Sequence, residues 1–216
     1  MAFRFENLTG SQVKDYTNVA GSAFLSVNAL IDRFRPLNYW TGSWVRSISN
    51  EDQLLICLMK LKLDLPMFDL ATRYHVSRTT IHNIFLTYLH CLHEILYKGM
   101  MKQIPSLSKN RGSLPESFGD FTNCRIIIDY TEFRICTPRK DLNASTLSYS
   151  DYKHNLTAKF LIGVTPNGSI TFVSNGFPGS TSDKEVTQRS GVLSHRKVGR
   201  FTFLQIFGKR YLFDVM

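Results

Sequence analysis

The sequence has few cysteines, no long apolar run and fewer acidic than basic residues, and each shortage narrows its possible functions. Its four cysteines lie far apart and form no Cys-x-x-Cys pair, which excludes a site built on closely paired thiols. They are typical of reduced core thiols in an intracellular protein. No apolar run reaches about 18 residues and the first residues form no apolar signal segment, so neither a membrane span nor secretion is expected.

Basic residues outnumber acidic ones along the chain. The 216 residues include 26 Lys and Arg against 17 Asp and Glu, which gives a formal net charge of +9. This balance favours a polyanionic partner, nucleic acid first, and no small-molecule cofactor is expected. The alternative is a basic surface that only maintains solubility. The length suits one domain with a smaller module, so two modules are expected.

Four segments of different character follow one another. Residues 1–48 mix aromatic residues with glycine, serine and proline without a sustained period, which predicts a loosely structured lead-in with one short helix over 20–34. Residues 49–98 have helical periodicity. Residues 99–123 are rich in proline, serine and glycine and predict a linker. From 124 to 216 the period changes to that of strands, and this segment is the second module.

The helical segment predicts a helix-turn-helix. Ser49 supplies a cap before the first helix, and Pro66 ends that helix. A short second helix is expected over 67–74 and a third over 78–97. In the third helix apolar residues recur at steps of three and four, so one face is expected to pack against the other helices.

The other face of the third helix is polar where the helix begins. At 100° per residue, Arg78, Thr79, His82 and Asn83 cluster opposite the apolar face, which predicts a solvent-facing patch. In a recognition helix such early residues contact base edges and phosphates. Arg78 suits a guanine or a phosphate, and Asn83 suits an adenine. A small helical bundle with a merely hydrated polar face is the alternative.

In the second module, a run of branched apolar residues delivers one acid, Asp129, to the carboxyl end of a strand expected over 125–135. A buried carboxylate is costly unless something pairs with it, and a divalent metal ion is the usual partner in nucleotidyl-transfer sites. A capping box at Ser182 predicts a helix. Further strands are expected over 158–164, 169–174 and 200–207. This order is that of a ribonuclease-H-like sheet, in which the fourth strand lies parallel beside the first.

Several motifs carry a resemblance to a known family. Among them are Val-Ser-Arg-Thr-Thr-Ile (76–81), Ile-Ile-Ile-Asp-Tyr-Thr-Glu (126–132), Lys-Phe-Leu-Ile-Gly-Val-Thr-Pro-Asn-Gly (159–168) and the segment 176–183. Over roughly residues 49–193 the chain resembles the DDE superfamily endonucleases, the Harbinger-like and related insertion-sequence-like transposases of animal genomes. The resemblance implies an α+β protein with an N-terminal helical helix-turn-helix module followed by a partial ribonuclease-H-like α/β domain.

The activity that the resemblance implies is metal-dependent cutting and joining of DNA, in which three acids hold two divalent ions, Mg²⁺ or Mn²⁺. Asp129 matches the first acid and would be a metal ligand. Glu132, in the same motif, and Asp183 are weaker catalytic candidates; helix-dipole stabilisation is the alternative for Asp183. Gln205 stands where the second acid is expected, and the chain ends at Met216 before the third. We therefore expect an incomplete catalytic site.

The resemblance thus implies a transposase-derived DNA-binding protein, with the nucleus as the expected compartment. Whether the chain is an active enzyme is left open, as is its oligomeric state. One alternative is a remnant or domesticated adaptor that only binds DNA. The other is a protein-interaction module without DNA affinity.

Overall fold

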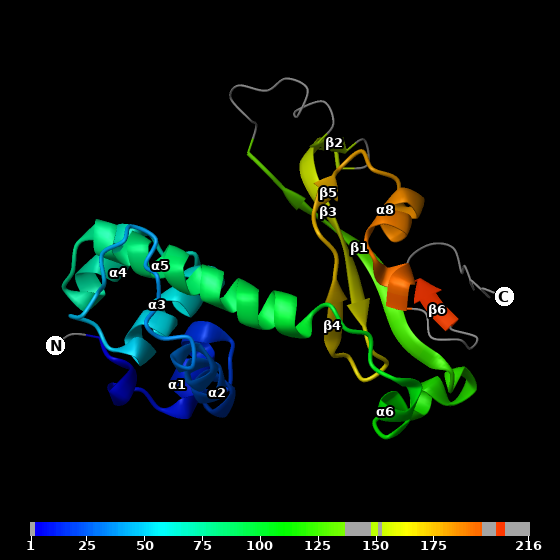
Figure 1. Ribbon diagram of the computed structural model, residues 1–216, viewed down its shortest axis with the longest axis horizontal. Helices are drawn as coiled ribbons and strands as arrows, with labels where there is room; N and C mark the ends of the chain where they lie inside the picture. The colour runs from blue at the N-terminus through cyan, green and yellow to red at the C-terminus, as the bar shows by residue number, and fades with distance from the viewer. Residues whose placement is uncertain (1–2, 137–147, 151–152, 196–201, 206–216) are drawn as a thin grey trace. The chain divides into compact units, whose positions relative to one another are not determined.

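The computed structural model describes residues 3–136, 148–150, 153–195 and 202–205, and the chain divides into two units, Met1–Lys98 and Gly99–Met216 (Figure 1). The first, the N-terminal unit, is helical. The second, the C-terminal unit, is built on a sheet with short helices. Together they give the α+β class that the sequence predicts.

The N-terminal unit contains five α-helices among its described residues: α1 (Gly10–Thr17), α2 (Gly21–Asp32), α3 (Asn50–Leu63), α4 (Met67–Tyr74) and α5 (Arg78–Leu92). A short 3-10 helix, η1 (Phe5–Asn7), precedes them, and the π-helical segment η2 (His93–Lys98) continues α5. The predicted cap at Ser49 is confirmed, because its hydroxyl accepts a hydrogen bond from the amide of Asp52 at 3.2 Å. The predicted second and third helices are confirmed as well.

The prediction of a loosely structured lead-in over 1–48 is wrong, because residues 5–32 are largely helical and 33–48 form a loop fixed by buried side chains. The expected helix over 20–34 is present as α2, but α1 also forms, and Val13, Phe24 and Ile31 are 0–1% exposed in the same core as Leu54 and Ile84. Each short helix contributes few apolar residues, so no period is visible in the sequence. Their burial depends on partners in a distant segment of the chain.

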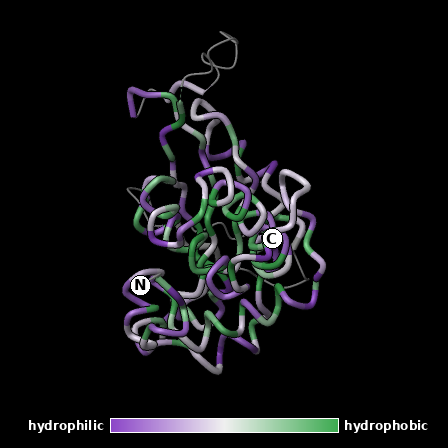
Figure 2. The backbone as a smooth tube through the Cα atoms, turned by 90° about the vertical axis from the view of Figure 1, so that its left-hand side faces the viewer, coloured by the Kyte–Doolittle hydropathy of each residue, from purple (hydrophilic) through white to green (hydrophobic). Residues whose placement is uncertain are grey.

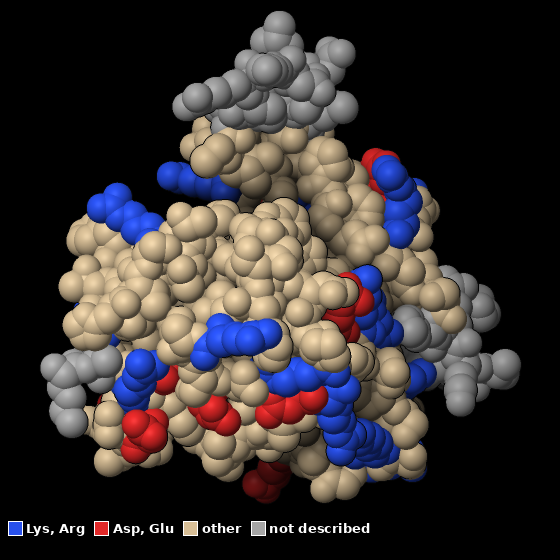
Figure 3. Space-filling model, turned by 60° about the vertical axis from the view of Figure 1, so that its left-hand side comes forward, with Lys and Arg blue, Asp and Glu red and all other residues tan. Residues whose placement is uncertain are grey.

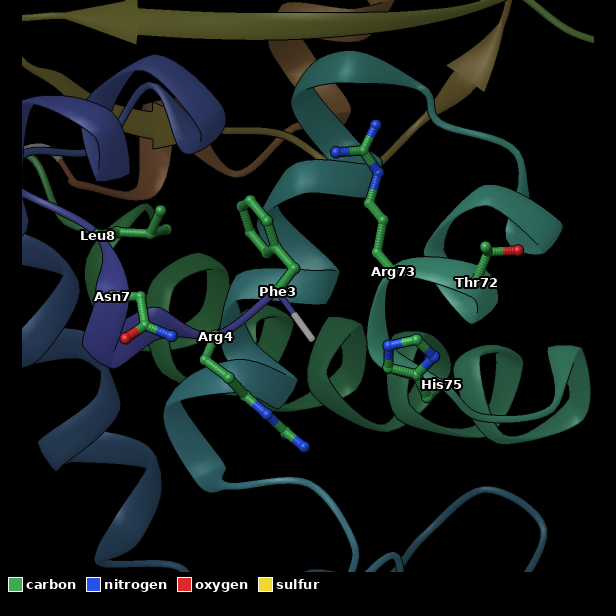
Figure 4. Close-up of a pocket in the computed structure, with 7 residues that line it drawn as sticks. All are labelled: Phe3, Arg4, Asn7, Leu8, Thr72, Arg73 and His75. Carbon is green, nitrogen blue, oxygen red and sulfur yellow. The ribbon is translucent and has the colours of Figure 1, made fainter. Parts of the chain in front are cut away.

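The first described residues are anchored as well, as the close-up in Figure 4 illustrates. The amide of Phe3 donates to the carbonyl of Arg73 in α4 at 3.0 Å. The carboxylate of Asp52 accepts hydrogen bonds from the amide of Phe5 at 2.6 Å and from the guanidinium of Arg4 at 3.1 Å. The hollow drawn in Figure 4, of about 340 Å³, is therefore a seam where the N-terminal segment packs on α4.

The C-terminal unit has six described strands: β1 (Cys124–Arg134), β2 (Tyr149–Ser150), β3 (Asn155–Val164), β4 (Ile170–Val173), β5 (Phe177–Pro178) and β6 (Thr202–Gln205). Its main sheet order is β2-β3-β1-β6. β3 is antiparallel to β1, whereas β6 is parallel to β1, with Ile128 opposite Gln205. The prediction that the fourth long strand lies parallel beside the first is confirmed.

The helices of the C-terminal unit are short: α6 (Leu107–Arg111), α8 (Asp183–Arg189), η3 (Glu116–Phe121) and η4 (Val192–His195). The hydroxyl of Ser182 accepts from the amide of Glu185 at 3.3 Å, so the predicted helix start is confirmed. α8 covers one face of the sheet, where Ile126 and Ile128 of β1 share a core with Val186.

Hydrophobic and hydrophilic residues alternate along the backbone (Figure 2). In the described part of the chain, no helix combines the length and the apolar composition that crossing a bilayer requires.

Candidate nucleic-acid interface and acidic centre

The turn between α4 and α5 sets the geometry of the helix-turn-helix. His75 closes α4 in the left-handed conformation at φ 55°, which ends the helix abruptly. Two residues later, the hydroxyl of Ser77 accepts from the amide of Thr80 at 3.0 Å and starts α5. The tight link that the sequence predicts is therefore built from one left-handed residue and one cap.

The start of α5 presents polar side chains to solvent. Arg78, Thr79 and His82 are exposed, as predicted, while Ile81 of the same helix is completely buried. The guanidinium of Arg78 lies over the ring of Phe68 in α4, 5.8 Å from its centroid. This contact with an exposed ring holds the charge at the surface without neutralising it. The contact of these residues with DNA stays a prediction.

Asn83 does not belong to this exposed patch, so its predicted solvent-facing position is wrong. Its side chain is buried at 3% exposure. The amide oxygen accepts from the backbone of Thr41 at 3.0 Å, and the amide nitrogen donates to the carbonyl of Ser43 at 2.9 Å. Asn83 therefore fixes a loop some forty residues earlier in the chain. Both of its polar atoms have protein partners, so the amide is not placed to read an adenine.

On the face drawn in Figure 3, charge alone does not mark one binding region. On the face drawn in Figure 3, lysine and arginine side chains form several separate groups, some of them beside aspartate and glutamate. The position of individual basic residues near α5 therefore carries more information than the net charge does.

Asp129 lies on the face of the sheet that α8 does not cover. Successive side chains of a strand alternate between faces, and Ile128 and Tyr130 on either side of it pack with the core beneath α8. Asp129 is partly exposed. Within the described ranges its carboxylate makes no hydrogen bond or ion pair that would explain its position structurally.

Glu132 and Asp183 lie together on the opposite face and share one cation. The ammonium of Lys159 is 3.4 Å from Glu132 Oε1 and 3.2 Å from Asp183 Oδ1. The side chains of Glu132 and Lys159 are only 9% and 12% exposed, whereas that of Asp183 is 51% exposed. The hydroxyl of Thr157 also donates to Glu132, at 2.8 Å. These groups connect β1, β3 and the start of α8, so they form a structural network.

The pKa of Glu132 reflects this network. Burial raises the pKa of the carboxyl, but hydrogen bonds from Ser150 and Thr157 and the charge of Lys159 outweigh burial and hold the pKa below its ordinary value of 4.5. Glu132 is therefore ionised at neutral pH as one member of a fixed pair. The orientation that strand alternation predicts for Glu132, away from Asp129, is confirmed.

A two-metal centre needs several carboxylates on one side of the sheet, and the described residues do not fit it. No three His, Cys, Asp or Glu side chains gather closely enough there to hold an ion. Gln205, which stands where the second acid is expected, pairs with Ile128, one residue before Asp129. Residues 206–216 lie outside the described ranges.

Replacing Glu132 with glutamine is expected to lower the free energy of unfolding of the C-terminal unit by about 1–3 kcal/mol at neutral pH, because a charged hydrogen-bond acceptor is lost. A carboxyl whose pKa is lower in the folded chain than in the unfolded chain stabilises the fold at pH values above the unfolded-state pKa. This stabilisation is lost as the pH falls through the folded-state pKa. The unchanged protein should therefore lose stability below about pH 4.5, and the variant should lose less.

Hydrogen exchange of β3 amides as a function of pH measures this effect. The exposed Glu116→Gln serves as the control and should follow the unchanged protein. Identical pH profiles for Glu132→Gln and the control would show that the network does not stabilise the sheet.

Two roles that shape the site are not predicted from the sequence. The sequence patterns do not single out Lys159, although opposite charges on two strands expected to pair are a usable signal. The loop held by Asn83 is not predicted either. Its signal in the sequence is that both tryptophans of the chain, Trp40 and Trp44, lie only four positions apart.

Comparison with known families gives two matches. Residues 128–209 match the family described as DDE superfamily endonuclease, and residues 46–98 match the helix-turn-helix of DDE superfamily endonuclease. The first range begins one residue before Asp129, and the second contains α3, α4 and α5. Together they span more than half of the chain. No curated protein and no solved structure matches it.

Proposed function

The chain belongs to the Harbinger-like transposase family of DDE superfamily endonucleases, and from this premise we propose that it is a transposase-derived protein whose helix-turn-helix binds DNA in the nucleus. One observation supports this most directly. Arg78, Thr79 and His82 stand exposed on the first turns of a helix whose opposite face is locked in the core. A rigid helix with donors at its start is the element that such motifs place in the major groove.

Metal-dependent cutting of DNA is not part of this proposal. Asp129 matches the first acid of the family in sequence, but Glu132 and Asp183 face the other side of the sheet and pair with Lys159. A single carboxylate cannot hold the two ions of the family reaction. The residues described here therefore support binding rather than catalysis.

The proposal predicts DNA binding that weakens steeply with salt. For a mixed-sequence duplex of about 20 base pairs, we expect a dissociation constant of about 10⁻⁶–10⁻⁴ M at physiological salt, measured by fluorescence anisotropy. Because each phosphate contact releases counterions, the logarithm of the binding constant should fall linearly with the logarithm of the salt concentration.

Arg78→Ala should weaken this binding about tenfold, since it removes a base or phosphate contact. Lys14→Ala is the matched control: it removes the same charge from an exposed position on α1, outside the helix-turn-helix, and should change affinity about twofold or less. Equal losses of DNA affinity in the two variants would refute the assignment of α5 as the recognition helix. Absence of binding at low salt would refute the proposed function.

A further inference from the structure

A hollow of about 510 Å³ lies beside the exposed start of α5. Its lining comes from two parts of the N-terminal unit, the loop before α3 and the beginning of α5; the lining residues are Thr41, Ser43, Trp44, Val45, Arg46, Ser47, Ser77, Thr79, Thr80 and Asn83. Six of these ten residues carry hydroxyl groups, one is an arginine and none is acidic. Hydroxyl donors, a guanidinium and the start of a helix together attract an anion.

The loop that forms one wall contains no helix or strand, yet buried side chains hold its backbone. Besides Asn83, the hydroxyl of Thr87 accepts from the amide of Trp40 at 3.0 Å. Gln53, 1% exposed, donates to the carbonyls of Val45 at 3.3 Å and Ile48 at 2.9 Å. The backbone is therefore fixed in advance, which lowers the entropy that a ligand would otherwise have to remove.

Two large side chains of this fixed loop, those of Trp44 and Arg46, are exposed. Trp44 is 59% exposed, and the guanidinium of Arg46 lies 4.7 Å from the centroid of its ring. The ring offers a flat apolar surface that a sugar or base can cover, with an N–H donor at its edge. Arg46 offers charge-assisted hydrogen bonds to phosphate oxygens. This pair matches the alternation of sugar and phosphate along a nucleic-acid strand.

We propose that the loop 40–47 is a second DNA-contacting element, which binds the phosphodiester backbone alongside the groove that α5 enters. Arg46 contacts a phosphate, and Trp44 packs on the neighbouring deoxyribose. The inference rests on the proposed function and adds a second part to the same interface. Asn83 then acts as a positioning residue, because it joins the loop to the recognition helix.

Arg46→Ala is expected to weaken binding of the mixed-sequence duplex about fivefold, equally for different sequences, and to reduce the salt slope by about one. Arg46→Lys should retain the slope, since the charge remains. Both variants should melt at the same temperature as the unchanged protein, because the side chain is exposed.

The two tryptophans provide an independent readout. They are equally exposed, at 58% for Trp40 and 59% for Trp44, but only Trp44 lines the hollow. Trp40 instead stacks on His90, with centroids 5.2 Å apart. In Trp40→Phe the remaining Trp44 should change its emission when DNA saturates the protein. In Trp44→Phe the emission of Trp40 should stay constant.

The outcomes separate the inference from the proposed function. One outcome refutes the second element but supports the recognition helix. In it, Arg78→Ala weakens binding, whereas Arg46→Ala keeps the full salt slope and the emission of Trp44 is constant. If the unchanged protein does not bind the duplex, both are refuted. A lowered salt slope in Arg46→Ala together with a Trp44 response supports the inference.

Discussion

Replacing Gly179 with alanine is expected to lower the free energy of unfolding of the C-terminal unit by about 3 kcal/mol or more. A Cβ atom at this position would lie 2.1 Å from the hydroxyl of Thr157, 2.8 Å from the carbonyl oxygen of Ser148 and 3.1 Å from that of Thr157. Two of these three neighbours are backbone atoms, one of them in β3, which cannot move aside without moving the chain. The displaced hydroxyl is also the one that donates to Glu132.

The positions of the tryptophans make this prediction measurable in the whole chain. Both lie in the N-terminal unit, so tryptophan fluorescence reports the unfolding of that unit alone. Hydrogen exchange of the amides in β1 and β3 reports the other unit. In Gly179→Ala we expect faster exchange in both strands and an unchanged fluorescence transition.

Gly119→Ala is the matched control within the same unit. No atom lies within 4 Å of a Cβ built there, so the substitution should be neutral or should stabilise by about 0.5 kcal/mol, through a less flexible unfolded chain. Equal exchange rates in the two alanine variants would contradict the tight packing around Gly179.

Asn83→Ala is expected to lower the free energy of unfolding of the N-terminal unit by about 2–3 kcal/mol, in the absence of any DNA. The substitution leaves the amide of Thr41 and the carbonyl of Ser43 without their protein partners. It should also weaken DNA binding, because the loop 40–47 is no longer held against α5. Chemical unfolding followed by tryptophan fluorescence measures the change directly, since both tryptophans lie in this loop.

Thr79→Ala separates a structural role from a base-reading role. Thr79 is exposed on the same helix, and its substitution should leave stability within about 0.5 kcal/mol of the unchanged protein. An Asn83→Ala variant that is as stable as Thr79→Ala, yet binds DNA more weakly, would restore the solvent-facing interpretation of Asn83.

The helical and the strand periodicity of the sequence correctly predicted the features that depend on local backbone geometry. The apolar steps of α5 identified its buried face, and strand alternation placed Glu132 away from Asp129. The order of strands and the single helix predicted that β6 lies parallel beside β1. Each of these features follows from residues close together in sequence or from a general rule of chain connection.

What the sequence did not predict depends on contacts between distant segments. A helical wheel places Asn83 opposite the apolar stripe, which is correct, but it cannot show that another segment covers that side. The same limit applies to α1, whose burial of Val13 needs α3 as a partner. For the acidic centre, the register of β1 against β3 brings Glu132 to Lys159, and the start of α8 brings Asp183 to the same ammonium group.

The division of acids between the two faces of the sheet has an evolutionary consequence. Glu132 and Lys159 maintain the fold, so selection should preserve them in any descendant that keeps a folded C-terminal unit, active or not. Asp129 makes no hydrogen bond or ion pair with another described residue, so the described fold places no comparable constraint on it. In lineages where cutting has been lost, position 129 should drift to neutral residues first, while the pair across β1 and β3 remains.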